Sequence, residues 1–321
     1  MRRLASLLAA TYLALAASTE SDASAPPLRD AYVTVALSIQ DLNGALALAG
    51  SIKKWEAARR RRVAISPDGA AAAAGAAERA VVALVPAGDA PTQAGRDLEM
   101  LAQMLAVAGY EVGRVEPVAC APAARPQAAA YCTALHAFGL AQYRSVLYLD
   151  PHAFVAAESA TALFDRRDHL TSERPLAAAP DTVLPSLFST KVLLLRPSAE
   201  RHRALLKLAR DGAVDSYDGG AQGFLNAVFP DWAEWAAPQR LSPRFNCADQ
   251  IAVRSGNSFQ HYEAEGDGVA ILHLDYIRRG AAAQTPALTP YAMEWKRLAD
   301  EGLAAIEADP RHPKSKARKG G

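Results

Sequence analysis

The chain has 321 residues, and 50% of them are hydrophobic, so it is long enough to bury a large core in one α/β domain or in two small domains. Its 35 lysines and arginines nearly balance 34 aspartates and glutamates, which leaves a formal net charge of +1. That charge gives no electrostatic reason to expect a nucleic-acid partner, and no base-reading module is visible. The dense basic run Arg59 to Arg62 is predicted to be a solvated helix end.

The N-terminus has the pattern of a secretory signal peptide. Its first three residues carry two arginines, residues 4–17 are rich in Leu and Ala, and small and polar residues follow. Residues 1–25 are therefore interpreted as a signal peptide and linker. An uncleaved anchor is the alternative, and only in that case do we expect contact with a membrane. The sequence predicts a protein of the secretory-pathway lumen (Golgi or ER) or a secreted protein.

The three cysteines fit this compartment. Cys120 and Cys132 are close enough in sequence to close one small loop, which would leave Cys247 free. No Cys-x-x-Cys pair occurs, so we expect no zinc–thiolate site. A buried, inert thiol is the default expectation for each cysteine.

Strand patterns alternate with helix patterns through the first part of the chain. Strands are predicted over 31–37, 80–85 and 110–115, and helices over 43–55 and 94–108, with Gly109 as a C-cap. This alternation predicts a mostly parallel sheet with right-handed crossovers. The low-complexity run 67–77 is left open between a loop and a frayed helix.

The second part of the chain departs from this alternation. A helix over 128–140 precedes a strand over 146–149, two extended segments lie between 176 and 195, a helix covers 199–210, and a glycine-rich turn at 218–226 opens another helix. Residues 281–321 are interpreted as a C-terminal helix and a disordered basic tail. In that helix Met293, Leu298 and Leu303 are expected to pack on the domain.

The apolar run Val146 to Leu149 stops at Asp150, Pro151 and His152. Open α/β sheets bind ligands outside the carboxyl ends of their strands. A carboxylate and an imidazole two residues apart at such an end have the chemistry to share one metal ion. The alternative is an ordinary turn in which Pro151 ends the pairing and His152 faces water. Taken alone, this stretch favours the ordinary turn.

The order of the segments, rather than any one of them, points to a known family. The seven segments that carry the likeness are Ala31 to Thr34 with Gly44 to Leu46, Thr133 to Phe138, Tyr143 to Val155, Phe188 to Val192 with Arg196 to Ser198, Asp218 to Asn226 with Phe229 to Trp232, Arg240 to Asn246, and Ile271 to Leu274. In this order and spacing they resemble the glycogenin-like family 8 glycosyltransferases, in particular the plant-type secretory branch related to glucuronosyltransferases. The resemblance implies an α/β domain over 31–280 with the GT-A nucleotide-diphospho-sugar transferase fold, a mostly parallel central sheet flanked by helices.

The resemblance also implies a divalent metal ion held by an Asp-x-Asp motif and a distant histidine, which together neutralise a leaving nucleotide diphosphate. Carried over to this chain, the motif falls on Asp150 and His152, and the distant ligand falls on His273. The polypeptide N-acetylgalactosaminyltransferases use such an Asp-x-His pair with a second histidine. These three residues are therefore the predicted ligands, and Mn²⁺ is the expected ion. Imidazole favours softer ions such as Zn²⁺, so the metal identity stays open.

Several positions depart from the motifs of the family. The lysine of its Thr-Lys-Leu segment is Ala134, its Asn-Ser-Gly turn runs from Ser189 to Lys191, and the acid of its Gly-Gly-Asp-Gln turn is Ala221. Ser189 and Lys191 are nevertheless predicted to bind the donor. Arg279 stands where the family has a lysine that closes over the diphosphate, and a guanidinium suits that task.

Three polar residues that match the family, Asp181, Asp218 and Gln222, are the predicted catalytic residues. The implied function is transfer of a hexosyl or glycuronosyl group, with retention, from a UDP-sugar donor to a glycan, lipid or protein acceptor. The alternative is a catalytically impaired protein that keeps the fold and binds nucleotide or glycan. A third and weaker interpretation is a structural role in which Asp150 and His152 only cap a turn.

Overall fold

The computed structural model describes residues 28–65, 78–89, 92–120, 130–274 and 285–310. The predicted signal peptide, the low-complexity run, Arg279 and the basic end beyond residue 310 lie outside these ranges. Within the described ranges, no helix is both long enough and apolar enough to cross a membrane.

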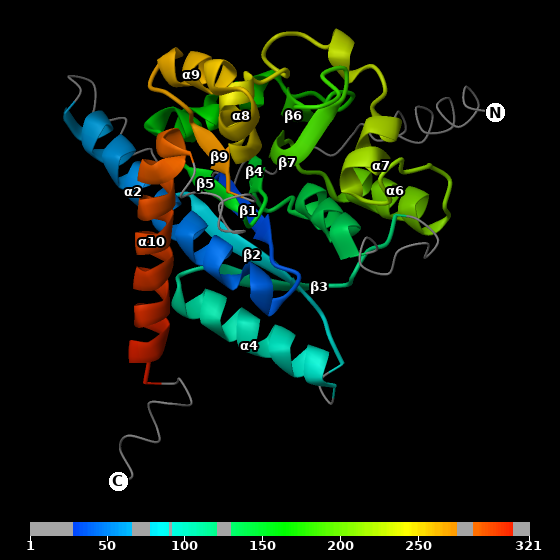
Figure 1. The fold of residues 1–321 in the computed structure, drawn as a ribbon. Helices are drawn as coiled ribbons and strands as arrows, with labels where there is room; N and C mark the ends of the chain where they lie inside the picture. Colours follow the sequence, from blue (N-terminus) through cyan, green and yellow to red (C-terminus); the bar gives the residue numbers. More distant parts are fainter. Residues whose placement is uncertain (1–27, 66–77, 90–91, 121–129, 275–284, 311–321) are drawn as a thin grey trace.

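A six-stranded sheet forms the centre of the molecule (Figure 1). Its strands are β1 (Ala31–Val35), β2 (Ala80–Pro86), β3 (Glu111–Val115), β4 (Val146–Leu149), β6 (Leu176–Pro180) and β7 (Phe188–Leu195). Their order is β3-β2-β1-β4-β7-β6. The pairs β1–β2, β1–β4 and β2–β3 are parallel, whereas β7 is antiparallel to both β4 and β6. The predicted central sheet is confirmed, and β7 is its antiparallel member.

Helices cover both faces of this sheet. One face carries α2 (Leu42–Ile65), α4 (Gln93–Val107), α10 (Thr289–Ala308) and η3 (Glu158–His169), and the other carries η2 (Ala130–Gly139), α6 (Ala199–Arg210) and α7 (Ala221–Val228). In β1, Val33 belongs to the same buried cluster as Leu135 of η2, while Tyr32 belongs to the cluster that contains Leu48 of α2. Because both faces are covered, the central strands read as continuous apolar runs.

Helix α2 is longer than predicted and ends with the basic run. Arg60, Arg61 and Arg62 are exposed, and Arg62 forms an ion pair of 2.7 Å with Glu158. The predicted solvated helix end is therefore confirmed. A basic end is favourable here because it complements the negative pole of the helix.

Helix α10 packs alongside α2 (Figure 1). Leu298 is buried and Leu303 is partly buried against the core, but the Met293 side chain is 69% exposed. The expectation that Met293 packs on the domain is wrong. The buried side chains of α10 are Leu298, Ala299 and Ile306, and at about 100° per residue Met293 lies on the side of the helix opposite to this group.

A second sheet of three very short strands was not predicted. It consists of β5 (Ala153–Val155), β8 (Cys247–Ala248) and β9 (Ile271–His273), in the order β5-β9-β8. Strands of two or three residues show no readable period. The remaining helices are η1 (Ile39–Asp41), η4 (Trp232–Glu234), η5 (Pro243–Phe245), α8 (Asp249–Arg254), α9 (Gly256–Ala264) and η8 (Pro286–Leu288).

The cysteines divide into a pair and a single thiol. Cys120 and Cys132 form a disulfide with a Cα–Cα distance of 5.7 Å, so the small loop is confirmed and the default of a free thiol is wrong for these two. Cys247 is free and buried, and burial raises the pKa of its thiol to about 12. A thiol with so high a pKa is inert at neutral pH.

Candidate functional site

The order of the central strands changes direction beside β1. The chain passes from β1 to β2 and β3 on one side, and β4 then pairs with the other side of β1. In open α/β sheets, ligands bind outside the carboxyl ends of the strands at such a switch point. Asp150 directly follows β4 and Asp41 lies in the short helix after β1, so both residues border this position.

The turn after β4 is closed by its own aspartate. The His152 amide donates a hydrogen bond of 2.9 Å to Asp150 Oδ1, and the Ala153 amide donates to the Asp150 carbonyl oxygen at 2.8 Å. The Asp150 amide in turn donates to the carbonyl oxygen of Lys191 at 2.8 Å. The Asp150 carboxylate is thereby held at the edge of the sheet, opposite Lys191 of β7.

The His152 ring does not face open water. Its Nε2 lies 3.6 Å from Asp41 Oδ1, and the side chain is only 16% exposed. Asp41 is itself held in place, because the amides of Leu37 and Ser38 donate to its Oδ2 at 2.8 and 3.1 Å. Burial first, and then the charges of Asp150 and Asp41, raise the pKa of the Tyr148 hydroxyl, so two carboxylates act on the same part of the switch point.

The small sheet brings His273 to this turn. His273 lies opposite Ala153 in the β5–β9 register, and the Leu274 amide donates to the His152 carbonyl oxygen at 3.3 Å. The His273 ring is buried, with Nε2 2.7 Å from Asn246 Oδ1. Because the amide oxygen is an acceptor, Nε2 carries the proton, and Nδ1 keeps the lone pair that a metal ligand needs.

The three predicted metal ligands thus lie on adjoining segments. One carboxylate and two imidazoles form a donor set that suits a divalent transition-metal ion, and the tautomer of His273 fits that role. Among the residues that the structure describes, however, no three His, Cys, Asp or Glu side chains are gathered closely enough to hold an ion. The backbone has brought the segments together, and the side chains would still have to turn toward a common centre.

A second polar cluster forms where β6 ends and α7 begins. Gln222 Nε2 donates to Asp181 Oδ2 at 3.1 Å and to the Tyr217 hydroxyl at 3.0 Å, and the Thr190 amide donates to Gln222 Oε1 at 3.3 Å. Asp181 Oδ1 holds its own loop by accepting from the amides of Val183 and Leu184. The structure therefore brings two predicted catalytic residues, Asp181 and Gln222, into direct contact.

Asp218 has a different local role. Its Oδ1 accepts from the amides of Gly220 and Gly223 at 2.8 and 3.0 Å, which caps the start of α7 in place of the side chain that Gly220 lacks. A β-carbon at position 223 would lie 2.6 Å from Asp218 Oδ1, so the cap requires glycine there. Burial raises the pKa of Tyr217 most, the hydrogen bond from Gln222 lowers it, and the charges of Asp218 and Asp181 raise it further. Asp218 therefore affects the Asp181–Gln222 cluster through its charge on Tyr217, which accepts a hydrogen bond from Gln222.

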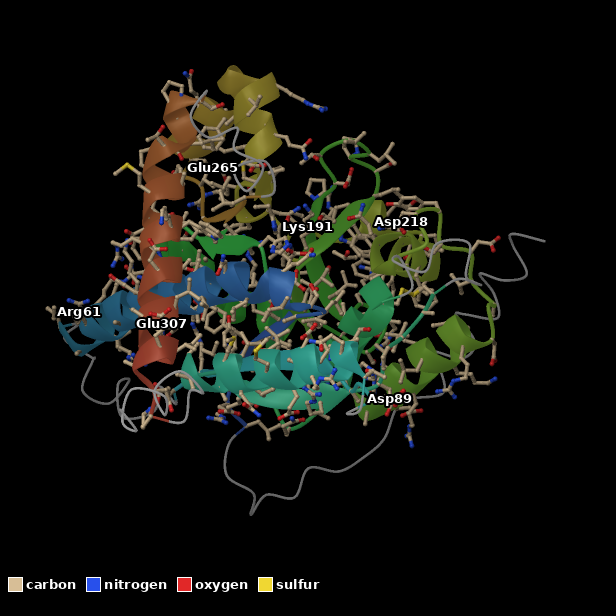
Figure 2. All side chains as sticks on the ribbon, turned by 60° about the horizontal axis from the view of Figure 1, so that its bottom comes forward. Arg61, Asp89, Lys191, Asp218, Glu265 and Glu307 are labelled. Atoms are coloured by element: carbon tan, nitrogen blue, oxygen red, sulfur yellow. A yellow bond between two sulfur atoms is a disulfide. The ribbon has the colours of Figure 1, made fainter. Side chains whose placement is uncertain are left out.

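The predicted donor-binding residues lie on β7. Ser189 is buried, and its hydroxyl oxygen accepts from the Lys191 amide at 3.3 Å. Figure 2 shows Lys191 near the middle of the molecule and Asp218 beside α7, both far from Arg61 at the end of α2. The prediction for Arg279 falls outside the described residues.

Sequence reasoning did not select Asp41, Asn246 or Tyr217. A signal existed for Asp41, because Ser38 and Asp41 form a capping box at the start of η1. Asn246 and Tyr217 stood inside segments used for the resemblance, but neither offers a local signal. Their roles depend on contacts with His273 and Gln222 that only the folded chain makes.

The fold is that of the GT-A glycosyltransferases. The crystal structure of an active-site mutant of LgtC matches it with a TM-score of 0.50 at 19% sequence identity, over 85% of this chain and 95% of that chain. No protein-family model matches the sequence.

The chain is a homologue of the glycogenins, which are glycosyltransferases of family 8. It is 38% identical to human glycogenin-1 over 109 residues, which are 34% of this chain and 28% of glycogenin-1. It is 31% identical to glycogenin-1 of Oryctolagus cuniculus over 150 residues, which are 47% of this chain and 41% of that relative. The chain therefore spans less than half the length of these relatives. The plant-type branch is not singled out by these matches and stays a prediction.

Proposed function

We propose that this protein is a hexosyltransferase or glycuronosyltransferase that uses a UDP-sugar and acts with retention on a glycan, lipid or protein acceptor. The observation that supports this most strongly is the meeting of the Asp150–His152 turn with His273 at the β1/β4 switch point. Homology to the glycogenins supports the same class of enzyme.

In this proposal Asp150, His152 and His273 hold a divalent ion, with Mn²⁺ as the expected species. When bound, such an ion neutralises the charge that develops on a diphosphate leaving group. Asn246 keeps His273 in the tautomer that carries its proton on Nε2, and Asp41 orients the His152 ring. Both are positioning residues that act through the imidazoles.

The donor is oriented by the chain's own polar groups. Lys191, Ser189 and Arg279 are assigned to the diphosphate, and the Asp181–Gln222 pair is assigned to the sugar. The Asp181 and Gln222 side chains are held in advance by hydrogen bonds, so little reorganisation of this pair is needed when charge develops. Asp218 contributes by fixing the start of α7, from which Gln222 projects.

A protein that binds nucleotide or glycan without catalysis is the second candidate. The observation that favours it is at position 221, where the chain has a buried alanine at the start of α7 and lacks the acid of the related motif. The Gln222 amide is moreover already engaged by Asp181 and Tyr217. Both features are expected of a site that still binds its ligand but no longer catalyses transfer.

We place the protein in the secretory-pathway lumen or outside the cell. The Cys120–Cys132 disulfide supports this placement, because structural disulfides persist mainly in oxidising compartments.

Release of UDP from a panel of UDP-sugars, measured with and without Mn²⁺, tests the transferase. We expect metal-dependent release from one donor, and faster release when an acceptor is added. If UDP and Mn²⁺ bind but no UDP-sugar is ever turned over, the catalytic proposal falls and the binding protein stands.

A further inference from the structure

The proposed function leaves a groove next to the Asp181–Gln222 pair unassigned. Its larger part is a cavity of about 710 Å³, within the range of about 300–1,000 Å³ that is usual for small-molecule sites. A second cavity of about 420 Å³ shares His169 and Pro238 with it. We call these two cavities the outer groove. It lies between the end of η3, the end of β6 and the segment 232–242.

The larger cavity is positively charged. Of its eleven lining residues, three are basic, namely Arg166, His169 and Arg240, and none is acidic. Within the described part of the chain, none of these three forms an ion pair with a carboxylate. The neighbouring Arg167, in contrast, lies 3.7 Å from a carboxylate oxygen of Asp168. Two permanently charged guanidinium groups without acidic partners are suited to bind a carboxylate, sulfate or phosphate.

The rest of the cavity wall is mainly apolar. Pro180, Pro185 and Trp232 line it, and Trp232 is held against Phe188 with ring centroids 5.5 Å apart. A few charged groups on an otherwise apolar, rigid wall are typical of a site for a small organic ligand. The C–H faces of a sugar ring fit such a wall, and an acidic substituent on the ring fits the arginines.

The outer groove adjoins the cluster proposed to face the sugar. Pro180 and Pro185 flank the loop that Asp181 pins. The backbone of Phe188, whose ring contacts Trp232, is held by the Asn226 side chain: the Phe188 amide donates to Asn226 Oδ1, and Asn226 Nδ2 donates to the Phe188 carbonyl oxygen. Asn226 Nδ2 also donates to the Gln222 carbonyl oxygen at 2.9 Å. The cavity and the Asp181–Gln222 pair therefore share their supporting residues.

The chain that follows Arg240 leads from the cavity toward the proposed metal ligands. Leu241 and Ser242 line the cavity and begin the segment that reaches Asn246, the hydrogen-bond partner of His273. The outer groove is thus lined both by residues that flank the Asp181 loop and by the segment that leads to the partner of His273.

We propose that the outer groove is the acceptor site and that the acceptor is an anionic saccharide, with its acidic group held by Arg240 and Arg166. This inference rests on the proposed function, since an acceptor implies a transferase. Carboxylated and sulfated sugars share the required chemistry, and the two are separated by experiment.

The test measures binding of trigalacturonic acid to the full chain by calorimetry, beside its methyl ester, which has the same shape without the charge. The acid is expected to bind at least about tenfold more tightly than the ester, because the ester loses the charge-assisted hydrogen bonds. Sulfated maltotriose, which has no carboxylate, shows whether sulfate serves as well. In 0.5 M salt the affinity for an anion held by the arginines should fall, whereas the affinity for neutral maltotriose should not. Of the anions that show this salt dependence, the one that binds more tightly is the preferred ligand.

Arg240 is the residue to replace, because it is exposed and its loss leaves the core intact. Arg240→Gln is expected to weaken binding of the acid about tenfold, and Arg240→Lys to restore part of the affinity. Arg203→Gln is the matched control, since Arg203 is an exposed arginine on α6 outside the groove. Equal binding of acid and ester, or equal losses in Arg240→Gln and Arg203→Gln, would overturn the inference.

The thermal shift produced by UDP with Mn²⁺ is measured on the same samples. A normal shift without binding of any anionic saccharide overturns this inference and leaves the proposed function standing. If UDP with Mn²⁺ produces no thermal shift, but trigalacturonic acid still binds in a way that depends on Arg240, the outer groove binds an anionic saccharide without being an acceptor site. That result overturns both the transferase and the acceptor role.

Discussion

Gly44 of α2 lies directly against the turn that carries His152. A β-carbon at position 44 would lie 2.9 Å from His152 Nδ1 and 2.4 Å from the carbonyl oxygen of Pro151. Real β-carbons do not approach other atoms so closely, so the turn after β4 rests on this part of α2 only because the residue there is glycine.

Gly44→Ala should therefore move the turn and lower stability. We expect a loss of about 1–3 kcal/mol in the free energy of unfolding, the usual cost of overpacking a buried contact. We also expect a smaller thermal shift with UDP and Mn²⁺. Urea unfolding and thermal-shift measurements check both. Gly256→Ala is the control, because a β-carbon there meets no atom within 4 Å. Full stability and a full ligand shift in Gly44→Ala would show that the contact has no bearing on the site.

His152 is the residue with which to test metal binding. UDP with Mn²⁺ should raise the Tm of the purified protein, and His152→Ala should abolish that rise, because the ion loses one of its three predicted ligands. His261→Ala, which removes an exposed histidine on α9, should leave the rise unchanged. If no divalent ion shifts the Tm of the wild-type protein, both the transferase and the nucleotide-binding candidates fail.

Asn246 should matter for metal affinity without touching the ion. Its side-chain oxygen accepts from His273 Nε2 at 2.7 Å and so selects the tautomer of that ring. Asn246→Ala is expected to weaken Mn²⁺ binding by about 10–100-fold, the usual effect of losing such a partner. Asn246→Asp keeps an acceptor oxygen and should retain most of the affinity. Direct Mn²⁺ titration gives the comparison, and equal losses in both variants would argue against the tautomer explanation.

Position 221 tests the placement of the sugar. If the missing acid limits the rate, Ala221→Asp should increase the rate of UDP release, by up to about 10²-fold on the scale of a preorganised polar group. Ala199→Asp adds the same charge to the exposed first turn of α6 and should change nothing. An unchanged rate in Ala221→Asp would mean that the sugar does not lie at the start of α7.

The contact between His136 of η2 and His202 of α6 predicts a loss of stability in acid. His202 Nε2 lies 3.0 Å from His136 Nδ1, and burial, followed by the charge of His136, lowers the pKa of His202 from 6.5 to about 4. Between these two values the unfolded chain binds more protons than the folded one, so stability falls as the pH falls.

Urea unfolding midpoints measured from pH 7 to pH 4 should show this decline. His202→Gln removes the titrating group and should flatten it, whereas His261→Gln, at an exposed site, should not. An equally steep decline in His202→Gln would assign the loss to other groups.

Local signals were enough to predict much of the scaffold. The bounds of β4 and α6 match the predicted 146–149 and 199–210, because an apolar run between polar residues marks the strand and Ser198 caps the helix. The same kind of signal located the turn at Asp150. The order of the segments then carried the resemblance that the GT-A fold and the glycogenin homology confirm.

The arrangement of the site was decided only by tertiary structure. His273 meets the His152 turn through strands of three residues, too short to be recognised without their partners. Its bond to Asn246 spans 27 residues of sequence, and the contact between Gln222 and Asp181 spans 41. By itself the sequence determined which residue types are present and in what order. Which of them touch depends on burial and strand pairing between distant segments, and these contacts exist only once the whole sheet has formed.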